Sequence, residues 1–161
     1  MHLAQVDKII SGGQTGADLA ALDFALAHKI AHGGWIPKGR RTENGPLPKK
    51  YNLIETSTPF YPERTEKNIL ASDGTIIFYW NEFIGGSLLT RAIALKQKRA
   101  ALSIDLEKET DYATEARLWL KTEKIKVLNI AGPRLSRVPQ IYAAVTRALE
   151  KIFFNAVHEK K

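Results

Sequence analysis

The feature that most constrains the fold of this chain is a glycine-rich turn that joins an apolar segment to a run of helical periodicity. Residues 6–10 predict a short buried strand, and residues 19–27 have the spacing of a helix. Glycines leave backbone N–H groups uncovered, and a helix N-terminus carries partial positive charge, so the turn predicts a site for an anionic, phosphate-bearing ligand. The pattern is neither the dinucleotide G-x-G-x-x-G nor a P-loop. The residues expected to form this site are Gly12, Gly13, Gln14, Thr15, Gly16 and Asp18.

The same turn also has a purely structural interpretation. Thr15 and Asp18 have the spacing of a capping box, with aspartate in place of glutamate, so they could serve only the first N–H groups of the helix. Gly12, Gly13 and Gly16 could serve a tight turn and close helix packing. We favour a ligand site because three glycines exceed what one turn requires.

The composition fits one globular domain that spans residues 1–161. The chain contains no cysteine, which excludes disulfides, thiolate metal sites and a cysteine nucleophile. Its apolar stretches are short and interrupted, so no membrane span is predicted. The N-terminus lacks a basic region followed by an apolar core, so we expect no signal peptide and a cytoplasmic location.

The chain is basic, with 24 Lys and Arg against 17 Asp and Glu and a formal charge of +7. Several of these cations fall in residues 38–58, a segment rich in glycine, proline and polar residues that has no clear period. Long irregular loops of this kind are usually binding loops or lids. A nucleic-acid surface is the competing interpretation, but exposed aromatics interleaved with the basic residues are not evident. The candidates for anion or ring contacts in this region are Trp35, Lys38 and Arg40.

Strand and helix patterns alternate along the chain. Strands are predicted at 6–10, 31–36, 75–79, 100–104 and 126–130, and helices at 17–28, 59–71, 87–98, 112–123 and 139–157. Such alternation indicates a Rossmann-like, doubly wound parallel sheet of about five strands in three α/β/α layers. Ligands of this fold lie beyond the carboxyl ends of the strands, at the switch point of strand order.

A second glycine pair follows the third strand. If the strand order is 2-1-3-4-5, this pair and the first glycine turn flank the same crevice, and two helix N-termini face one pocket. The residues expected there are Gly85, Gly86, Ser87 and Thr90, although a turn with a helix cap remains an alternative. Further contacts are expected from Arg64 and Asn68, early in the preceding helix, and from Arg134, after the fifth strand. Surface pairing of Arg64 and a core position for Trp35 remain open.

Catalytic machinery is hard to find in this sequence. The four histidines form no close-spaced metal motif, and neither a nucleophile elbow nor a paired-carboxylate signature is present. Asp18 is the best-placed acid, and helix capping explains it sufficiently. We therefore predict no catalytic residues and no protein-held metal, and favour a binding protein over an enzyme.

These motifs together resemble the molybdenum-cofactor carrier protein family, within the Rossmann-like superfamily that includes lysine-decarboxylase-like proteins and DNA-processing protein A. The resemblance runs from about residue 9 to residue 149. The positions that carry it are 10–18, 21–23, 32–35, 37–40, 43, 45–46, 63–66, 68, 72–75, 85–87, 90 and 129–134.

The resemblance implies that the ligand is molybdenum cofactor, a pterin with a terminal phosphate and a dithiolene that holds the metal. Two relatives supply alternatives. Phosphoribohydrolases that act on nucleotides carry P-G-G-x-G-T-x-x-E, but residues 84–92 here lack the glycine that follows the pair and the acid. DNA-processing protein A binds single-stranded DNA and has a similar S-G-x-x-x-G-x-D segment, so nucleotide sensing and nucleic-acid binding stay open as alternatives.

The last predicted helix suggests association between copies of the chain. Tyr142, Ile152, Phe153 and Phe154 widen its apolar surface beyond one narrow stripe. We therefore expect a homo-oligomer, a dimer or higher, that forms through helices.

Overall fold

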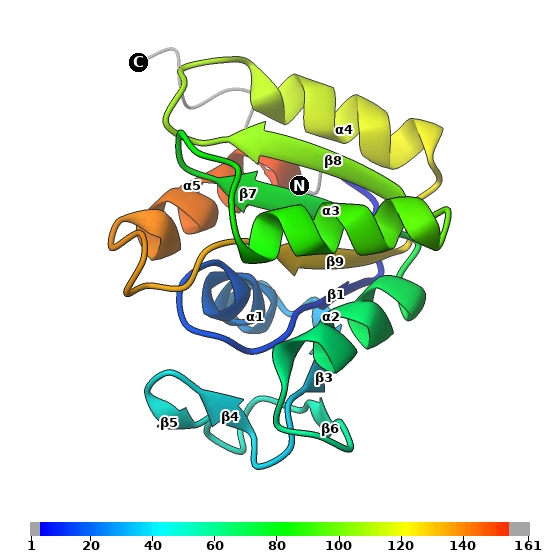
Figure 1. The fold of residues 1–161 in the computed structure, drawn as a ribbon. Helices are drawn as coiled ribbons and strands as arrows, with labels where there is room; N and C mark the ends of the chain where they lie inside the picture. The colour runs from blue at the N-terminus through cyan, green and yellow to red at the C-terminus, as the bar shows by residue number, and fades with distance from the viewer. Residues whose placement is uncertain (1–3, 155–161) are drawn as a thin grey trace.

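The computed structural model describes residues 4–154 and has a central parallel sheet of five strands. Helices cover both faces of this sheet, which confirms the predicted three-layer Rossmann-like class (Figure 1). Among the described residues, no helix is long and apolar enough to cross a membrane. The strands of the sheet are β1 (Lys8–Ile10), β2 (Ala31–Gly33), β7 (Gly74–Tyr79), β8 (Ala100–Asp105) and β9 (Val127–Ala131).

Five helices, in two sets, pack on the sheet in the described part of the chain. One set is α1 (Ala17–Ala27), α5 (Ile141–Phe153) and α4 (Tyr112–Thr122), where α5 packs between the other two. The other set is α2 (Tyr61–Leu70) and α3 (Gly86–Lys96), which pack against each other in front of the sheet in Figure 1. The main core lies between the sheet and the first set, where side chains such as Phe24, Phe78, Leu128 and Phe153 are buried.

The strand order differs from the one considered from the sequence. The sheet runs β2-β1-β9-β7-β8, so the fifth of the predicted strands lies between the first and the third, and the order 2-1-3-4-5 was wrong. Periodicity identifies strands but does not say which strands pair. Taken from β9 through β1 and β2 to β7 and β8, the order is 3-2-1-4-5, that of the Rossmann sheet with its chain started at a different strand.

The second predicted strand is split at Gly34. β2 ends at Gly33, and β3 (Trp35–Ile36) leaves the main sheet to pair in parallel with β6 (Ile54–Glu55). Gly34 has a φ of 130°, a backbone conformation open to glycine rather than to L side chains. The final helix begins at Ile141 and ends at Phe153, and residues 155–157 of its predicted extent lie outside the described residues.

Residues 38–58, which we call the arm, have more structure than their sequence indicates. Besides β6, the arm contains the antiparallel pair β4 (Arg41–Thr42) and β5 (Gly45–Pro46). A second, smaller hydrophobic core lies where the arm packs against α1, and five buried side chains form it. These are Leu22, Ile36, Leu47, Tyr51 and Leu53.

Of the four residues that suggested an oligomer, two are buried within the chain and two, Tyr142 and Phe154, are half-buried. Ile152 and Phe153 are fully buried, and the ring of Phe154 lies 5.9 Å from that of Phe24. The Tyr142 hydroxyl donates to the Asp23 carboxylate over 2.5 Å. These side chains therefore no longer support a homo-oligomer, which stays a prediction.

Candidate functional site

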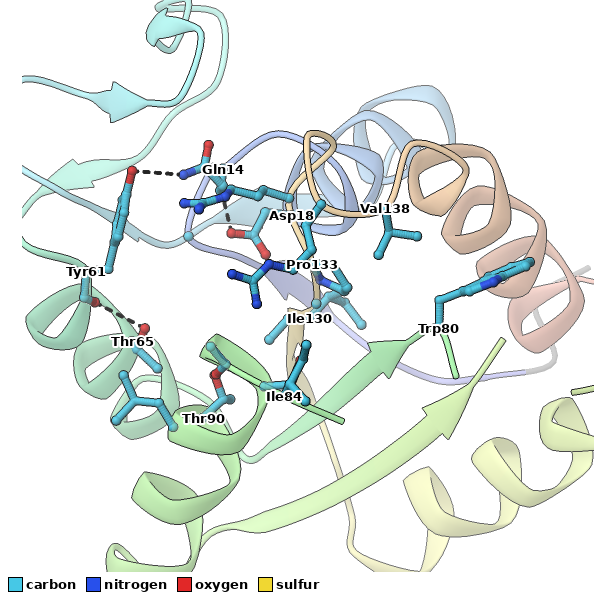
Figure 2. Close-up of a pocket in the computed structure, with 18 of the residues that line it drawn as sticks. Gln14, Asp18, Tyr61, Thr65, Trp80, Ile84, Thr90, Ile130, Pro133 and Val138 are labelled. Atoms are coloured by element: carbon cyan, nitrogen blue, oxygen red, sulfur yellow. Dashed lines mark hydrogen bonds between the residues drawn. The ribbon is translucent and has the colours of Figure 1, made fainter. Parts of the chain in front are cut away.

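A pocket of about 670 Å³ lies at the carboxyl ends of the strands. It spans the switch point between β9 and β7, where open α/β sheets bind their ligands. Figure 2 shows Asp18 and Pro133 near its middle and Tyr61 and Trp80 at opposite ends. The sequence-predicted residues that line this pocket are Gly12, Gln14, Asp18, Arg64, Asn68, Gly86, Ser87, Thr90 and Arg134.

The other sequence-predicted residues lie outside this lining. They are Gly13, Thr15, Gly16, Trp35, Lys38, Arg40 and Gly85.

The glycine turn after β1 directs most of its amides to acceptors of the protein. The Gln14 N–H donates to the Asp18 carboxylate over 3.2 Å, and the Thr15 N–H donates to Oε1 of Gln14 over 3.0 Å. The first amide of α1, that of Ala17, donates to the Pro133 carbonyl over 3.2 Å. Few amides of this turn are therefore left to bind the anionic ligand that the sequence predicts there.

Close packing explains the glycines of this turn. A Cβ at Gly16 would lie 2.5 Å from the Pro133 carbonyl oxygen, and one at Gly13 would lie 2.8 Å from Cδ1 of Ile36. Both glycines also have positive φ, 80° and 76°. The structural interpretation left open by the sequence thus accounts for these two positions.

Arg40 is occupied in holding the arm together. Its guanidinium donates to four backbone carbonyls, with the shortest bond, 2.6 Å, to Tyr51. The other three carbonyls are those of Leu47, Leu53 and Pro48. Such a set of contacts leaves Arg40 a structural residue of the arm rather than a residue of the pocket.

Trp35 and Lys38 also form contacts within the protein rather than with the pocket. Both backbone groups of Trp35 pair with the side-chain amide of Asn68, and Nζ of Lys67 lies 4.6 Å from the centre of the Trp35 ring. The Lys38 N–H donates to the Thr58 carbonyl over 2.9 Å, and its side chain is exposed. The ring-binding side expected here is therefore not part of the pocket.

Asp18 and Arg64 form a buried ion pair in the pocket. Nη1 of Arg64 lies 3.4 Å from Asp18 Oδ2 and donates to the Gly12 carbonyl over 2.9 Å. A Cβ at Gly12 would lie only 2.0 Å from this nitrogen, so the glycine is what lets the arginine cross the turn. Burial raises the pKa of Asp18 to about 6, against the lowering effects of Arg64 and the Gln14 amide. Arg64 therefore pairs with the buried Asp18 and not with a neighbouring residue at the surface.

The N-terminus of α3 opens on the pocket. A Cβ at Gly86 would meet no atom within 4 Å, so this first residue of the helix borders open space. Ser87 lines the pocket with 7 % of its surface exposed, and its hydroxyl reaches the open space of the pocket, since no buried side-chain polar atom of the described residues lacks a hydrogen-bond partner. Nη1 of Arg137 lies against the same turn, 2.6 Å from where a Gly85 Cβ would be. A helix N-terminus, a hydroxyl and a guanidinium therefore meet here.

The Glu43 carboxylate joins the arm to the loops that follow β1 and β9. It accepts hydrogen bonds from the Thr15 hydroxyl and from the amide and hydroxyl of Ser136, and lies 3.6 Å from Nε of Arg134. Burial alone would raise the pKa of Glu43, but the bonds from Ser136 and Thr15 and the charge of Arg134 lower it below its ordinary value. The Glu43 N–H donates in turn to Oε1 of Gln14 over 2.9 Å. Thr15 is thus engaged by the arm rather than by the pocket.

Replacing Glu43 with alanine should release the arm without unfolding the sheet. We expect the loss of its hydrogen bonds to lower the free energy of unfolding by about 1–3 kcal/mol and to speed tryptic cleavage after Lys49 and Lys50. Limited proteolysis followed by mass spectrometry measures this. Glu55→Ala is the matched control, since Glu55 accepts one bond within the arm, from the Gly39 amide. Equal cleavage of the two variants would show that Glu43 does not hold the arm in place.

Several residues of the pocket lining were not predicted from the sequence. They come mainly from the loops after β7, β8 and β9, and the strand order alone brings these loops together. The sequence identified the loops after β7 and β9 as candidates, but it did not predict that β9 pairs with β7 and sets these loops side by side. The missed residues are Tyr61, Thr65, Trp80, Asn81, Glu82, Ile84, Leu89, Glu107, Asn129, Ile130, Ala131, Gly132, Pro133, Arg137, Val138, Pro139 and Gln140.

A Rossmann-like sheet with a permuted chain and a pocket at its switch point defines a class of α/β ligand-binding domains. The chain belongs to the circularly permutated YpsA SLOG family, whose model matches residues 9–153. It is similar to a crystal structure of a putative molybdenum carrier protein from Syntrophus aciditrophicus SB, with 49 % sequence identity and a TM-score of 0.91. The match covers 94 % of this chain and 97 % of that one, which confirms the family resemblance. No curated protein matches the chain.

Proposed function

We propose that this protein binds a phosphate-bearing small molecule in the pocket at the switch point and acts as a carrier for it. The observation that carries the proposal is the N-terminus of α3, which borders open space at Gly86 and places Ser87 on the pocket lining. The Ser87 hydroxyl can donate a hydrogen bond to a phosphate oxygen placed at this point of the pocket. The 11-residue helix adds partial positive charge at the same point.

Three arginines support an anionic ligand. Arg64, Arg134 and Arg137 all line the pocket, and guanidinium groups bind phosphate through two parallel hydrogen bonds. Arg64 and Arg134 are partly neutralised by Asp18 and Glu43, whereas Arg137 forms no ion pair within residues 4–154. We therefore assign Arg137, with Ser87, as the principal contact for the phosphate.

Molybdenum cofactor is the cargo we propose, because the neighbouring crystal structure bears the name of a molybdenum carrier. In residues 4–154, no group of three His, Cys, Asp or Glu side chains could hold a metal ion. The pocket lining instead offers arginines, a hydroxyl and a helix N-terminus, which fit the phosphate of the cofactor. A molybdenum centre that arrives on the dithiolene of a pterin needs no protein thiolate, which suits a chain without cysteine.

Titration of the full chain with AMP and with inorganic phosphate tests the proposal. We expect Arg137→Gln to weaken AMP binding about tenfold or more, since a charge-assisted hydrogen bond is lost, and Ser87→Ala to weaken it by about two- to tenfold. Isothermal titration calorimetry gives both dissociation constants. Lys96→Gln, at the far end of α3, is the control and should bind as the parent does.

Three outcomes would contradict the proposal. They are absence of binding by the parent protein, unchanged binding in both pocket variants, and electron density for the phosphate outside the pocket. We expect no release of free base from AMP, because the second glycine loop lacks the acid of the phosphoribohydrolases. Binding of single-stranded DNA in place of AMP would favour the nucleic-acid alternative.

A further inference from the structure

The pocket continues beyond its anion-binding part toward the loops that follow β7 and β8. This far end is lined by Trp80 and by the carboxylate residues Glu82 and Glu107, and it lies opposite Tyr61 in Figure 2. Glu82 and Glu107 form no ion pair within the described residues. The lining thus combines three guanidinium groups with an indole and two carboxylates that form no ion pair among the described residues.

The turn that carries Trp80 is held in an uncommon backbone conformation. Asn81 has a φ of 65°, in the left-handed region, and the Glu82 N–H donates to the Trp80 carbonyl over 2.7 Å. Asparagine adopts this region more readily than most residues other than glycine, so Asn81 permits the tight turn at this position. Here it places Trp80 and Glu82, two residues apart, on the lining of one pocket.

A single carboxylate fixes the two loops of this end to each other. Oδ1 of Asp105, the last residue of β8, accepts from the Asn81 N–H over 2.9 Å and from the Glu107 N–H over 3.0 Å. The Leu106 N–H also donates to the Tyr79 carbonyl over 2.9 Å. These bonds fix the backbone of the two loops relative to each other before any ligand binds, which lowers the entropic cost of recognition.

We propose that this end of the pocket binds a planar heteroaromatic ring whose edge presents two adjacent nitrogen donors, a ring N–H beside an exocyclic amino group. Guanine and pterin rings have this edge, and a carboxylate accepts both donors in parallel. The Trp80 indole provides the face on which the ring stacks. The two carboxylates repel a phosphate, so they also orient the ligand with its phosphate toward Arg137. This inference rests on the proposed function and names the class of ligand.

Adenine should be discriminated against at such a site. Its corresponding edge offers one amino donor beside a ring nitrogen that is an acceptor, and that acceptor faces a carboxylate unfavourably. A good bidentate pair to one base discriminates against another by about 1–3 kcal/mol, which is about 5- to 150-fold in affinity. The parent protein should accordingly bind GMP at least about fivefold more tightly than AMP or IMP.

The experiment compares GMP, AMP, IMP and ribose 5-phosphate by calorimetry in the full chain. We expect the double variant Glu82→Gln with Glu107→Gln to remove the preference for GMP and to leave ribose 5-phosphate affinity within about twofold of the parent. Trp80→Leu should weaken GMP and AMP about tenfold through lost stacking, again without effect on ribose 5-phosphate. Glu109→Gln, in the same loop but outside this lining, is the matched control.

The outcomes separate the two proposals. If ribose 5-phosphate and GMP both fail to bind, the proposed function fails. If ribose 5-phosphate binds but the parent shows no preference for GMP over IMP and AMP, the ring site is overturned while the anion site stands. A preference that persists in the double variant overturns the assignment to Glu82 and Glu107. The comparison of GMP with IMP in the parent needs no variant, so poor folding of a variant does not decide the result.

Discussion

Replacing Gly34 with alanine should destabilise the protein by about 3–5 kcal/mol, enough to unfold much of it at room temperature. A Cβ at this position would lie 2.2 Å from the carbonyl oxygen of Ser11 and 3.0 Å from its nitrogen. Ser11 is fully buried and its N–H donates to Gly33, so the backbone cannot move away without disturbing the pairing of β1 with β2. The φ of 130° adds conformational strain to the clash. Urea denaturation followed by circular dichroism measures the loss.

Gly39→Ala provides the control for this prediction. Gly39 has a φ of 85°, also in the region that favours glycine, but a Cβ there would meet nothing within 4 Å. It should therefore cost only about 1 kcal/mol. Similar losses in the two variants would mean that backbone conformation alone, and not the close approach of Ser11 to Gly34, sets the effect.

Replacing Arg64 with alanine should produce a loss of stability that grows with pH. Burial holds the pKa of Asp18 at about 6 in the folded protein, above its ordinary value of 3.8. Since the folded pKa is the higher one, the stability linked to Asp18 is fully present below pH 4 and is lost as the pH rises through 6. Removal of Arg64 raises this pKa further and leaves a buried carboxylate without its cation. We expect a loss of about 3 kcal/mol at pH 8, and of about 1 kcal/mol at pH 5.

The double variant Arg64→Ala with Asp18→Asn tests the origin of that loss. Asparagine keeps an oxygen for the Gln14 amide and carries no charge, so the pH-dependent part of the effect should disappear. Urea denaturation of the parent, the two single variants and the double variant at pH 5 and pH 8 gives the eight values required. If the loss in Arg64→Ala is the same at both pH values, the ion pair with Asp18 does not account for it.

The sequence was sufficient for the fold class because its periodic segments are strong. β7 is a run of apolar and β-branched residues buried on both faces, and α5 has an apolar stripe from Ile141 to Phe153. The strand order could not be predicted, because it depends on which strands pair along their edges and no local sequence pattern determines that pairing. The break at Gly34 was missed for a similar reason, since the contact that requires it comes from Ser11, distant in the sequence.

The site was predicted in part for the same physical reasons. Gly86 and Ser87 were identified because a glycine pair at a helix start has a local signature. Trp80 and Arg137 were missed because nothing near them in the sequence distinguishes them from ordinary loop residues. Arg40 was misleading, since a basic residue in a loop resembles a ligand contact until its hydrogen bonds to the carbonyls of the arm are known.

The central place of β9 has a consequence for how the protein is made. β9 pairs with β1 on one side and β7 on the other, yet it is the last strand along the chain within residues 4–154 (Figure 1). A nascent chain that ends before Val127 therefore has two separate half-sheets, with open edges at β1 and β7 that invite wrong pairing. The pocket at the switch point between β9 and β7 forms only once this one strand is inserted, so a chain without β9 lacks the proposed binding site.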